Sequence, residues 1–476
     1  MANQAYESLR PTFEALGQGH VFTFWEKLEE AERRQLLDDL RCVNLSHLPG
    51  LMNLVKSASA ESVHVEGLSP APVIQRETVP ADTVAHGRML ISKGRVCAMT
   101  VAGGQGTRLG FDGPKGAFPI SPVKNKTLFQ LFAESILATE RRYGTSIQWY
   151  IMTSPGNDAE TQGYFRRNRF FGLAADRVTF FQQGVMPSFD QAGRILLEQK
   201  HRLALSPDGH GGSLLALATS GVLADMARRG IDYISYFQVD NPLVACIDPV
   251  FIGLHAAQGA EMSSKTLPKA DDLEKVGNFA MQGGRQVVIE YSDLPESLAR
   301  ARNPDGSRKF DAGNIAIHIL SRSFVERLTV DRAAFALPWH IAKKKIPHVD
   351  HSTGETIEPA SPNGVKLEAF VFDALPLATK ASLLGTSRAE EFSPVKNKDG
   401  VDSVETARRD MSLRAQRWLK FAGVSTPDSA APDSGGAAVE ISPLVALDAE
   451  SLRDRVRSGE LPASLPGDSA KGFYLG

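Results

Sequence analysis

The chain has 476 residues, of which 42% are hydrophobic, so it can bury a large core and has the length of two or three domains. Its 53 basic and 55 acidic side chains leave a net charge of −2, which gives no support for bulk attraction to nucleic acid or to a membrane surface. We therefore expect neither nucleic acid nor a membrane as a partner.

Cysteine usage and the N-terminus indicate the cytoplasm. Cys42, Cys97 and Cys246 are far apart and set in largely apolar sequence, which fits neither a disulfide framework nor a zinc site. The N-terminus carries Glu7 and has no uninterrupted apolar core, and apolar runs elsewhere stay short of membrane-spanning length. We expect a cytoplasmic protein without a signal peptide or an anchor.

Residues 1–94 are predicted to form a helical arm followed by a linker. Between residues 22 and 41, apolar side chains recur at a spacing of about 3.6 among charged ones, which indicates an amphipathic helix. Prolines at positions 70, 72 and 80 predict an irregular linker over residues 63–85. The apolar positions of the predicted helix are Phe24, Leu28, Ala31 and Leu36.

From residue 95 the chain alternates between apolar strands and helices. Such alternation favours a parallel sheet that is covered on both faces, with ligands at the carboxyl ends of its strands. A Gly283-Gly284 turn between two strand-like runs predicts a hairpin at 278–292. The other strands are expected at 96–101, 147–154, 178–184 and 232–241, and helices at 128–142, at 158–168 and in a long segment that ends near residue 229.

The second half is mixed, and its tail reads as a separate module. Strand-like or apolar runs occur at 310–320 and 368–379, and the segment 342–350 is basic, with Lys343, Lys344 and Lys345 expected to form a solvated face. Residues 424–439 are rich in Ser, Asp, Ala, Gly and Pro, which predicts a flexible link. We therefore divide the chain into an N-terminal arm and linker (1–94), a catalytic domain (95–400) and a C-terminal link and small module (401–476).

The segment 96–116, VCAMTVAGGQGTRLGFDGPKG, predicts an anion site. A buried strand surfaces into a glycine-rich turn, and glycines let a phosphate approach the backbone amides while Arg108 and Lys115 supply charge. The turn has one residue too many for a dinucleotide fingerprint, and Ala117 follows Gly116 where a P-loop needs lysine. A purely structural turn is the remaining alternative, which the two nearby cations disfavour.

Several segments together resemble a known family. AGGQGTRLG with the following PKG is similar to the nucleotide loop of the UTP-dependent uridylyltransferases, the UDP-sugar pyrophosphorylases, and most of all their eukaryotic-type UDP-N-acetylhexosamine branch. FFQQGVMP, PDGHGG, VDNPLVACIDPVFIG, VVIEYSDL, FDAGNIAIH, KKKIPHVD, GVKLEAFVFD and EFSPVKN resemble family motifs in the same order over about residues 95–400. The resemblance implies a Rossmann-like nucleotidyltransferase fold with a mixed, mostly parallel central sheet, an N-terminal helical arm and a small C-terminal domain.

The implied reaction joins UTP and a sugar 1-phosphate, most of all N-acetylglucosamine 1-phosphate. An oxygen of the sugar phosphate attacks the α-phosphorus of UTP, and pyrophosphate leaves. The protein must hold two polyanions and neutralise the pentavalent phosphorus, which calls for cations, Mg²⁺ and backbone donors. The resemblance makes Mg²⁺ the expected cofactor, with UTP and a sugar 1-phosphate as the partners of a chain that we expect to be a monomer.

The resemblance also implies roles for individual residues around the nucleotide. Gly103, Gly104 and Gly106 would approach the uridine and the triphosphate, with Arg108 and Lys115 on the leaving pyrophosphate and Lys396 at the α-phosphorus. Gln183 would read the uracil edge, because an amide offers the donor and acceptor that an imide face requires. The turn Gly209, His210 and Gly211 would offer amides to uracil or phosphate before a helix.

Metal and sugar roles are assigned in the same way. Asp240 closes a strand, where a carboxylate can bind Mg²⁺ beside substrate phosphates, and Asn241 would act through the ribose or a water. The alternative for Asp240 is an ordinary cap or turn residue, and the alternative for Gln183 is an ordinary surface glutamine. Without the motif context, Lys366 and Lys396 would each be a solvated charge. The sugar and its phosphate would meet Gly277, Glu290, Gly313, Asn314 and Lys366.

His210 keeps the choice of sugar open. The N-acetylhexosamine branch usually has asparagine at this position, and the glucose-type branch often has histidine. A UTP-dependent enzyme for glucose 1-phosphate, or one that accepts many sugar phosphates, is therefore an alternative. A non-catalytic nucleotide-sugar binding protein is a further one, which the joint presence of Arg108, Lys115, Asp240 and Lys396 disfavours.

Overall fold

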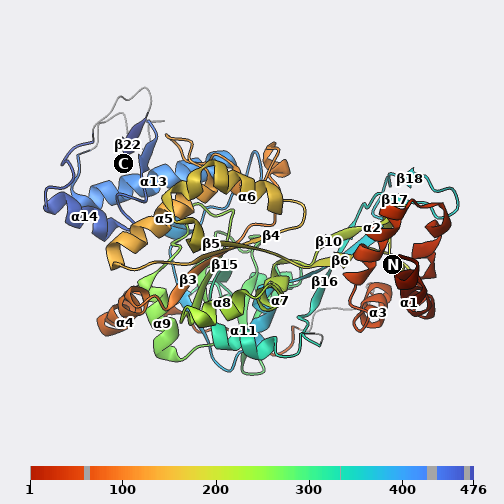
Figure 1. The fold of residues 1–476 in the computed structure, drawn as a ribbon. Coiled ribbons are helices and arrows are strands. Elements are labelled where there is room, and N and C mark those ends of the chain that lie inside the picture. Colours follow the sequence, from red (N-terminus) through yellow and green to blue (C-terminus); the bar gives the residue numbers. More distant parts are fainter. Residues whose placement is uncertain (1, 58–64, 333, 426–436, 466–471) are drawn as a thin grey trace. The chain divides into compact units, whose positions relative to one another are not determined.

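The structure is a computed structural model that describes residues 2–57, 65–332, 334–425, 437–465 and 472–476. The chain forms two compact units that interleave along the sequence, and Figure 1 traces them in sequence colours. Unit 1 contains Met1–His64, Gln183–Thr219 and Leu328–Ala374, and unit 2 contains Val65–Gln182, Ser220–Arg327 and Leu375–Gly476.

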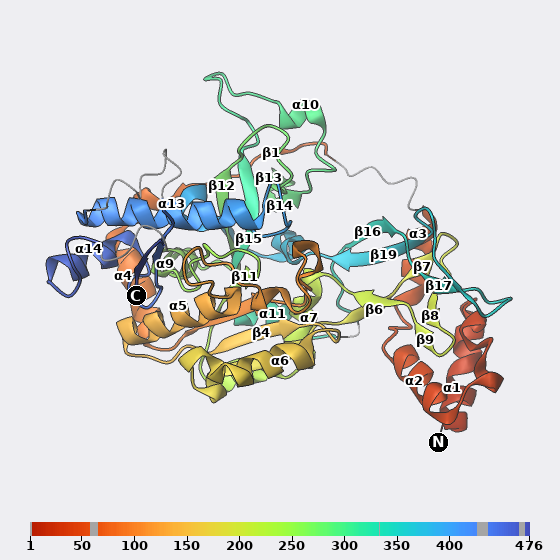
Figure 2. The ribbon, with the colours of Figure 1, turned by 90° about the horizontal axis from the view of Figure 1, so that it is seen from above.

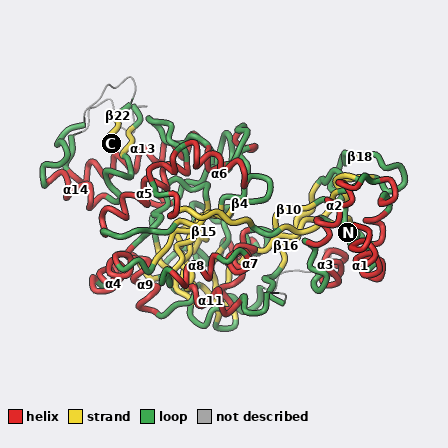
Figure 3. The backbone as a smooth tube through the Cα atoms, viewed as in Figure 1, coloured by secondary structure: helices red, strands yellow, loops and turns green. Residues whose placement is uncertain are grey.

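Unit 2 is built on a mixed, mostly parallel sheet, as predicted. Its main path runs in the order β2-β20-β12-β15-β11-β3-β4-β5, in which only β15 is antiparallel to its neighbours β11 and β12. The strands are yellow in Figure 3. Their bounds are β1 Ser69–Pro70, β2 Ile74–Gln75, β3 Val96–Val101, β4 Trp149–Thr153, β5 Val178–Gln182, β11 Tyr233–Gln238, β12 Met262–Pro268, β13 Asn278–Gln282, β14 Arg285–Ile289, β15 Ala312–Ser321 and β20 Ala381–Gly385.

Helices cover both faces of this sheet, which explains why its central strands are mostly apolar. In Figure 1, α5 and α6 lie on one face, and α4, α8, α9 and α11 lie on the other. Every residue of β4 is buried, and so are the first five of β3, because side chains on both faces meet helices. The helices are α4 Ala81–Ser92, α5 Leu128–Tyr143, α6 Asp158–Arg167, α8 Val222–Arg228, α9 Pro249–Gln258, α10 Glu296–Ala299, α11 Arg322–Leu328, α12 Arg388–Glu391, α13 Val404–Ala422 and α14 Ala449–Arg457.

The predicted hairpin is present, and the tail adds a small apolar cluster of its own. β13 and β14 pair antiparallel around the Gly283-Gly284 turn. After residue 400, α13 and α14 pack with β21 (Val439–Ile441) and β22 (Phe473–Leu475) around Leu419, Leu452 and Phe473. Of the predicted flexible link 424–439, residues 426–436 lie outside the described part of the chain.

Three predicted elements differ from the structure. The long helix that ends near residue 229 is two helices, α7 (Ser213–Thr219) and α8, because Gly221 takes a left-handed conformation with φ 83° between them. The helix predicted at 22–41 begins only at Glu30, where Glu29 and Glu32 form a capping box, and Ala31 is exposed. The predicted linker contains β1, β2 and the first five residues of α4, while residues 63 and 64 lie outside the described part of the chain.

Unit 1 joins the N-terminal helices to short strands from two later segments. The buried amide of Gln18 donates from Nε2 to the carbonyl of Gly193 (3.0 Å) and accepts from the amide of Ile195 (2.8 Å). Figure 2 shows β16, β19 and β7 side by side, in agreement with their pairing. The elements are α1 Ala2–Ala15, α2 Glu30–Arg41, α3 Leu48–Ser57, β6 Val185–Pro187, β7 Phe189–Asp190, β8 Leu197–Gln199, β9 Arg202–Leu203, β10 Leu205–Pro207, α7, β16 Trp339–Lys344, β17 His348–Val349, β18 Thr356–Ile357 and β19 Gly364–Ala369.

Candidate active site

The glycine-rich segment after β3 folds into a tight loop whose own amides hold it closed. The backbone amide of Gly106 donates to the carbonyl of Gly113 (2.9 Å), and the backbone amide of Lys115 donates to the carbonyl of Gly104 (3.1 Å). Gly104 and Arg108 are exposed and Gly103 is half-buried. The loop therefore presents glycine backbone and a guanidinium to solvent at the end of a buried strand, as an anion site requires.

Two side chains that follow β4 brace this loop. Asn157 is buried and donates from Nδ2 to the carbonyls of Ala102 (2.9 Å) and Gly104 (3.3 Å), and Ser154 donates from Oγ to the carbonyl of Gly103 (2.9 Å). Sequence reasoning missed both residues. Their only signal was a Ser-Pro-Gly-Asn turn directly after a predicted strand, next to β3 in a parallel sheet.

Close packing against Phe129 explains why residue 116 is glycine, and it gives a prediction. A Cβ atom at Gly116 would lie 2.2 Å from the Phe129 ring of α5, whereas a Cβ at Gly104 would meet no atom within 4 Å. We expect Gly116→Ala to lower the free energy of unfolding by about 1–3 kcal/mol, the usual cost of overpacking. Thermal unfolding measures it, with Gly104→Ala as the matched control that keeps its melting temperature. Equal melting temperatures for both variants would contradict this packing.

Lys115, Asp240 and the segment that carries Lys396 lie together in unit 2. Lys115 Nζ is 3.9 Å from Asp240 Oδ2, and each side chain is 15% exposed. The amide of Val395, the residue directly before Lys396, donates to the carbonyl of Asp240 (2.8 Å). Lys396 Nζ lies 3.3 Å from Asp402 Oδ2 and is 40% exposed. The structure thus brings Lys115 to the predicted metal ligand and places the backbone next to Lys396 beside it.

The donor set at Asp240 fits Mg²⁺. One carboxylate at a strand end, beside a phosphate-binding loop, is the usual protein contribution to an Mg²⁺ ion that also binds substrate phosphates. Among the described residues, no group of three or more His, Cys, Asp or Glu side chains could hold a metal ion by itself. Asp240 would therefore hold the ion jointly with a bound triphosphate.

The side chain of Asn241 bonds to the backbone of the segment before Lys396. Its buried amide donates from Nδ2 to the carbonyl of Glu391 (2.7 Å), and its Oδ1 accepts from the amides of Leu243 (3.3 Å) and Ser393 (3.2 Å). These backbone bonds use both ends of the side-chain amide. Asn241 fixes the segment before Lys396, and the predicted contact with ribose remains a hypothesis.

Four predicted sugar residues meet where β13, β14 and β15 come together. A Cβ on Gly277 would lie 3.0 Å from Glu290 Oε1 and 3.7 Å from the Cβ of Asn314. The amide of Asn314 donates to the carbonyl of Gly277 (2.8 Å), and Gly313 pairs with Asn278. Val288, Glu290 and Asn314 therefore surround a position where only glycine fits, and the carboxylate and amide types among them suit contacts to sugar hydroxyls.

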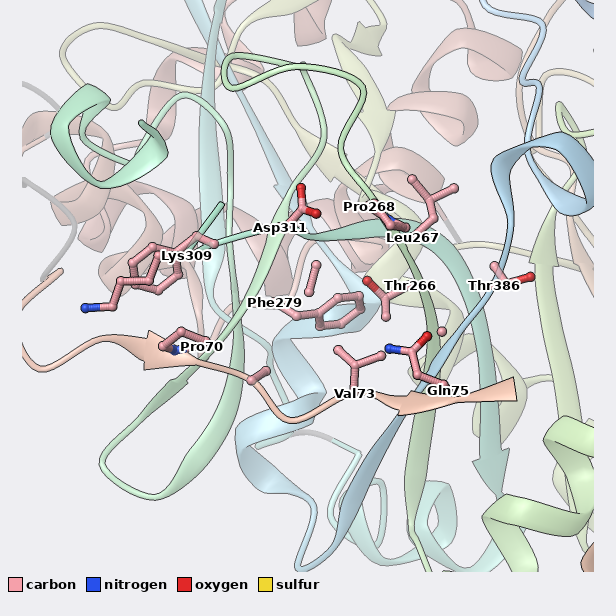
Figure 4. Close-up of a pocket in the computed structure, with 14 residues that line it drawn as sticks. Pro70, Val73, Gln75, Thr266, Leu267, Pro268, Phe279, Lys309, Asp311 and Thr386 are labelled. Atoms are coloured by element: carbon pink, nitrogen blue, oxygen red, sulfur yellow. The ribbon is translucent and has the colours of Figure 1, made fainter. Parts of the chain in front are cut away.

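A cavity of about 280 Å³ lies next to these residues in unit 2, and Figure 4 shows its lining. Thr266 lines the cavity and is the cross-strand partner of Asn314. Phe279 lines it as well, two residues beyond Gly277 on β13. The cavity adjoins the proposed sugar residues but does not include them.

Gln183 and the turn Gly209–Gly211 belong to unit 1. Gln183 is buried, with 7% of its surface exposed. Gly209 has φ 83°, and a Cβ there would lie 2.4 Å from the carbonyl oxygen of Ala369, so the turn packs its backbone against β19. Lys366 is half-buried on the same strand, opposite Ala342 of β16.

His210 stacks on an aromatic cluster that sequence reasoning missed. Its ring lies 5.1 Å from that of Phe370 at 20°, and Phe370 stacks in turn on His340 at 4.3 Å. Nδ1 of His210 accepts from the amide of Val371 (3.1 Å), which assigns the proton of the neutral ring to Nε2. Burial lowers the pKa of His210 to about 4, so the ring is neutral at physiological pH.

Asp208 is a buried carboxyl group beside this turn. A Cβ on Gly184 would lie 2.3 Å from its Oδ2, and a Cβ on Gly212 would lie 2.2 Å from its carboxyl group. Its Oδ1 is buried without a hydrogen-bond partner. Burial raises the pKa of Asp208 to about 7, because the charged form loses its hydration. Asp208 thus fills the space that two glycines leave next to Gln183.

This pKa predicts how stability depends on pH. The folded pKa of Asp208 is raised, so the folded state binds the proton more tightly, and stability falls as pH rises from about 4 to about 7. A shift of three pKa units corresponds to a change of about 4 kcal/mol in the free energy of unfolding over this pH range. Asp208→Asn removes this pH dependence, because the asparagine side chain does not titrate. We expect the melting temperature of the variant, relative to that of the wild type, to increase as pH rises from 4.5 to 8. A difference that stays constant with pH would contradict the raised pKa.

The fold and the loop define the class of the protein. A mostly parallel sheet with a glycine-rich loop after β3 and a carboxylate just beyond the end of β11 is the arrangement of a nucleotide-binding α/β protein. The chain belongs to the family described as UTP–glucose-1-phosphate uridylyltransferase, which it matches over residues 51–412. No helix among the described residues is long and apolar enough to cross a membrane.

Relatives with similar sequences cover nearly the whole chain. The chain is 36% identical over 473 residues to a "Probable UDP-N-acetylglucosamine pyrophosphorylase" from Dictyostelium discoideum, which covers 95% of this chain and 96% of that protein. It is 36% identical over 458 residues to a "UDP-N-acetylglucosamine pyrophosphorylase" from Saccharomyces cerevisiae, which covers 92% of this chain and 94% of that protein. These matches confirm the resemblance seen in the motifs.

Solved structures show the same fold. The crystal structure of a putative UDP-N-acetylglucosamine pyrophosphorylase from Entamoeba histolytica is 35% identical, with a TM-score of 0.73, and covers 81% of this chain and 96% of that chain. The Trypanosoma brucei uridine diphosphate N-acetylglucosamine pyrophosphorylase, solved with an inhibitor, is 28% identical with a TM-score of 0.81 and covers 99% of this chain and 98% of that chain. A UDP-glucose pyrophosphorylase from Leishmania major, at 16% identity and TM-score 0.62 over 89% of this chain and 87% of that chain, shares the fold alone.

Proposed function

We propose that the protein transfers UMP from UTP to N-acetylglucosamine 1-phosphate and releases pyrophosphate. The observation that carries the proposal is the meeting of the glycine loop, Lys115 and Asp240 beside the Lys396 segment in unit 2. Relatives at 36% identity that span nearly the whole chain carry the name of this activity. Cytoplasmic location stays part of the proposal and is supported by the three free cysteines.

Each group of residues would bind or neutralise a different part of the triphosphate. The loop residues Gly103, Gly104 and Gly106 let the uridine and the triphosphate approach the backbone, and Arg108 and Lys115 hold the β- and γ-phosphates that leave as pyrophosphate. An oxygen of the sugar phosphate forms the new bond to the α-phosphorus as the bond to the bridging oxygen of pyrophosphate breaks, with no protein nucleophile. Lys396 neutralises the charge that gathers on the α-phosphorus. Mg²⁺, held by Asp240, supplies charge neutralisation on the phosphates when bound.

Base and sugar would be recognised by separate sets of side chains. Gln183 reads the uracil edge through its amide, with the Gly209–Gly211 turn supplying backbone donors. Gly277, Glu290, Gly313 and Asn314 contact the sugar, and Lys366 contacts its phosphate. The proximity of Glu290 and Asn314 to Gly277 supports the sugar assignment.

Glucose 1-phosphate is the second candidate acceptor, because position 210 is histidine. In the structure this histidine is neutral and stacked on Phe370. Pyrophosphate release tests the choice: purified protein with UTP and Mg²⁺ receives N-acetylglucosamine 1-phosphate, glucose 1-phosphate or galactose 1-phosphate. We expect the highest kcat/KM with the first. A higher value with glucose 1-phosphate would replace it as the substrate, and no release with any acceptor would favour a binding protein.

A further inference from the structure

Lys265 of β12 is the centre of a buried ion cluster in unit 2. Its Nζ lies 2.6 Å from Asp248 Oδ2 and also forms an ion pair with Glu391. Arg76 donates to both oxygens of Asp248, from Nη1 at 2.7 Å and Nη2 at 3.1 Å. We call Arg76, Asp248, Lys265 and Glu391 the Lys265 cluster. Its two positive and two negative charges balance.

Burial makes each charge of this cluster dependent on the others. Lys265 is fully buried, Asp248 is 4% exposed and Glu391 is 7% exposed. Lysine and glutamate are almost never buried unless they are paired, because each loses its hydration. The neighbouring cations hold the pKa of Asp248 well below its usual range. Lys265 therefore fixes Glu391 at one place in the interior.

Glu391 begins the segment that leads to Lys396. The carbonyl of Glu391 accepts from the side chain of Asn241 (2.7 Å), and the amide of Val395 donates to the carbonyl of Asp240 (2.8 Å). The segment 391–395 is thus attached at both ends to the Asp240-Asn241 pair. A shift of Glu391 would move Lys396 relative to Asp240.

The same strand reaches the proposed sugar residues and the cavity. Thr266, next to Lys265, donates from Oγ1 to the carbonyl of Gly313 (2.9 Å). Thr386 donates from Oγ1 to Glu391 Oε1 (3.0 Å), and Figure 4 shows Thr266, Thr386 and Gln75 around one cavity. Lys265 is therefore connected to both ends of the proposed reaction, the acceptor sugar and the charge at the α-phosphorus.

We propose that Lys265, through Glu391, is a positioning residue that sets the place of Lys396 for uridylyl transfer. It touches no substrate, and the inference rests on the proposed function for its kinetic consequence. Misplacement of a catalytic group by about 1 Å can cost up to about 100-fold in rate. Loss of the Lys265-Glu391 link should therefore lower kcat by about 10- to 100-fold while KM for UTP changes little.

A pair of variants separates positioning from folding. Lys265→Met leaves Asp248 and Glu391 with one cation and should lower both the melting temperature and kcat. Lys265→Met combined with Glu391→Met leaves the Arg76-Asp248 pair balanced and should recover the melting temperature, because a buried pair is often replaced by apolar residues without loss. The double variant should still have the low kcat, since the tie to the 391–395 segment is gone. If the Lys265-Glu391 pair served stability alone, the double variant would recover both the melting temperature and kcat.

The matched control is the buried pair Lys126-Glu134, which are 2.6 Å apart and each 8% exposed. Lys126→Met with Glu134→Met should keep the wild-type kcat. Hydrogen exchange adds a readout that needs no turnover: amides at 392–397 should exchange about tenfold faster in the Lys265-Glu391 double variant than in the wild type. A wild-type kcat in that double variant, or unchanged exchange at 392–397, overturns the proposal. An inactive wild type contradicts the proposed function instead, and hydrogen exchange still decides the positioning role.

Discussion

Replacing Lys396 with alanine should lower kcat by about two orders of magnitude or more, the usual scale for the loss of one donor that stabilises a charged transition state. The structure holds this lysine next to Val395, whose amide is bonded to the carbonyl of Asp240. Its side chain is 40% exposed and, among the residues that the structure describes, has an ion-pair partner only in Asp402, at 3.3 Å, so a phosphate can compete for it. KM for UTP should change less than kcat, because the charge at the α-phosphorus grows in the transition state.

Initial rates with saturating UTP and sugar phosphate measure this effect. Lys345→Ala is the control, since Lys345 is exposed in the basic segment that we expect to be solvated. The control should keep wild-type kcat. If Lys396→Ala does the same, Lys396 leaves the list of catalytic residues.

The second large effect is expected at Asp240. Asp240→Asn keeps the size of the side chain but removes the charge that faces Lys115 at 3.9 Å and the proposed Mg²⁺. Turnover should fall by about two orders of magnitude or more, and the Mg²⁺ concentration for half-maximal rate should rise, because a neutral amide is a poorer ligand for a hard cation.

Mg²⁺ titrations of the initial rate check this prediction. Asp232 gives the matched control, because it lies directly before the first residue of β11, at the opposite end of the strand from Asp240, and pairs with Arg95. Asp232→Asn should keep the Mg²⁺ dependence of the wild type. An unchanged Mg²⁺ requirement in Asp240→Asn would remove Asp240 as the metal ligand.

The central strands were predictable because burial on both faces demands a continuous apolar run. β3 and β4 lie within their predicted ranges for this reason, and the hairpin of β13 and β14 followed from its glycine turn. The break at Gly221 was not predictable, because an isolated glycine is tolerated inside many helices and only the left-handed φ ends this one. The division at residues 94 and 400 stays a prediction, while the units seen in the structure depend on contacts between distant segments.

The candidate site was predictable where a motif brings charge and glycine together along the chain. Arg108, Lys115 and Asp240 follow strands, and strand ends meet at one edge of a parallel sheet. Supporting residues were not predictable, because Asn157 reaches the loop through backbone carbonyls that are far away in sequence. The same holds for Lys265, which reads as one more lysine until the fold buries it between Asp248 and Glu391.

Competition between acceptors in one reaction tests the central claim most directly. Limiting UTP is mixed with Mg²⁺, the protein and equal amounts of N-acetylglucosamine 1-phosphate and glucose 1-phosphate, and mass spectrometry measures the two UDP-sugars. Their ratio is the ratio of the two kcat/KM values. We predict an excess of UDP-N-acetylglucosamine of about tenfold or more, which is the scale of discrimination that one contact to the N-acetyl group supplies. An excess of UDP-glucose, or the absence of any UDP-sugar, would contradict the proposed function.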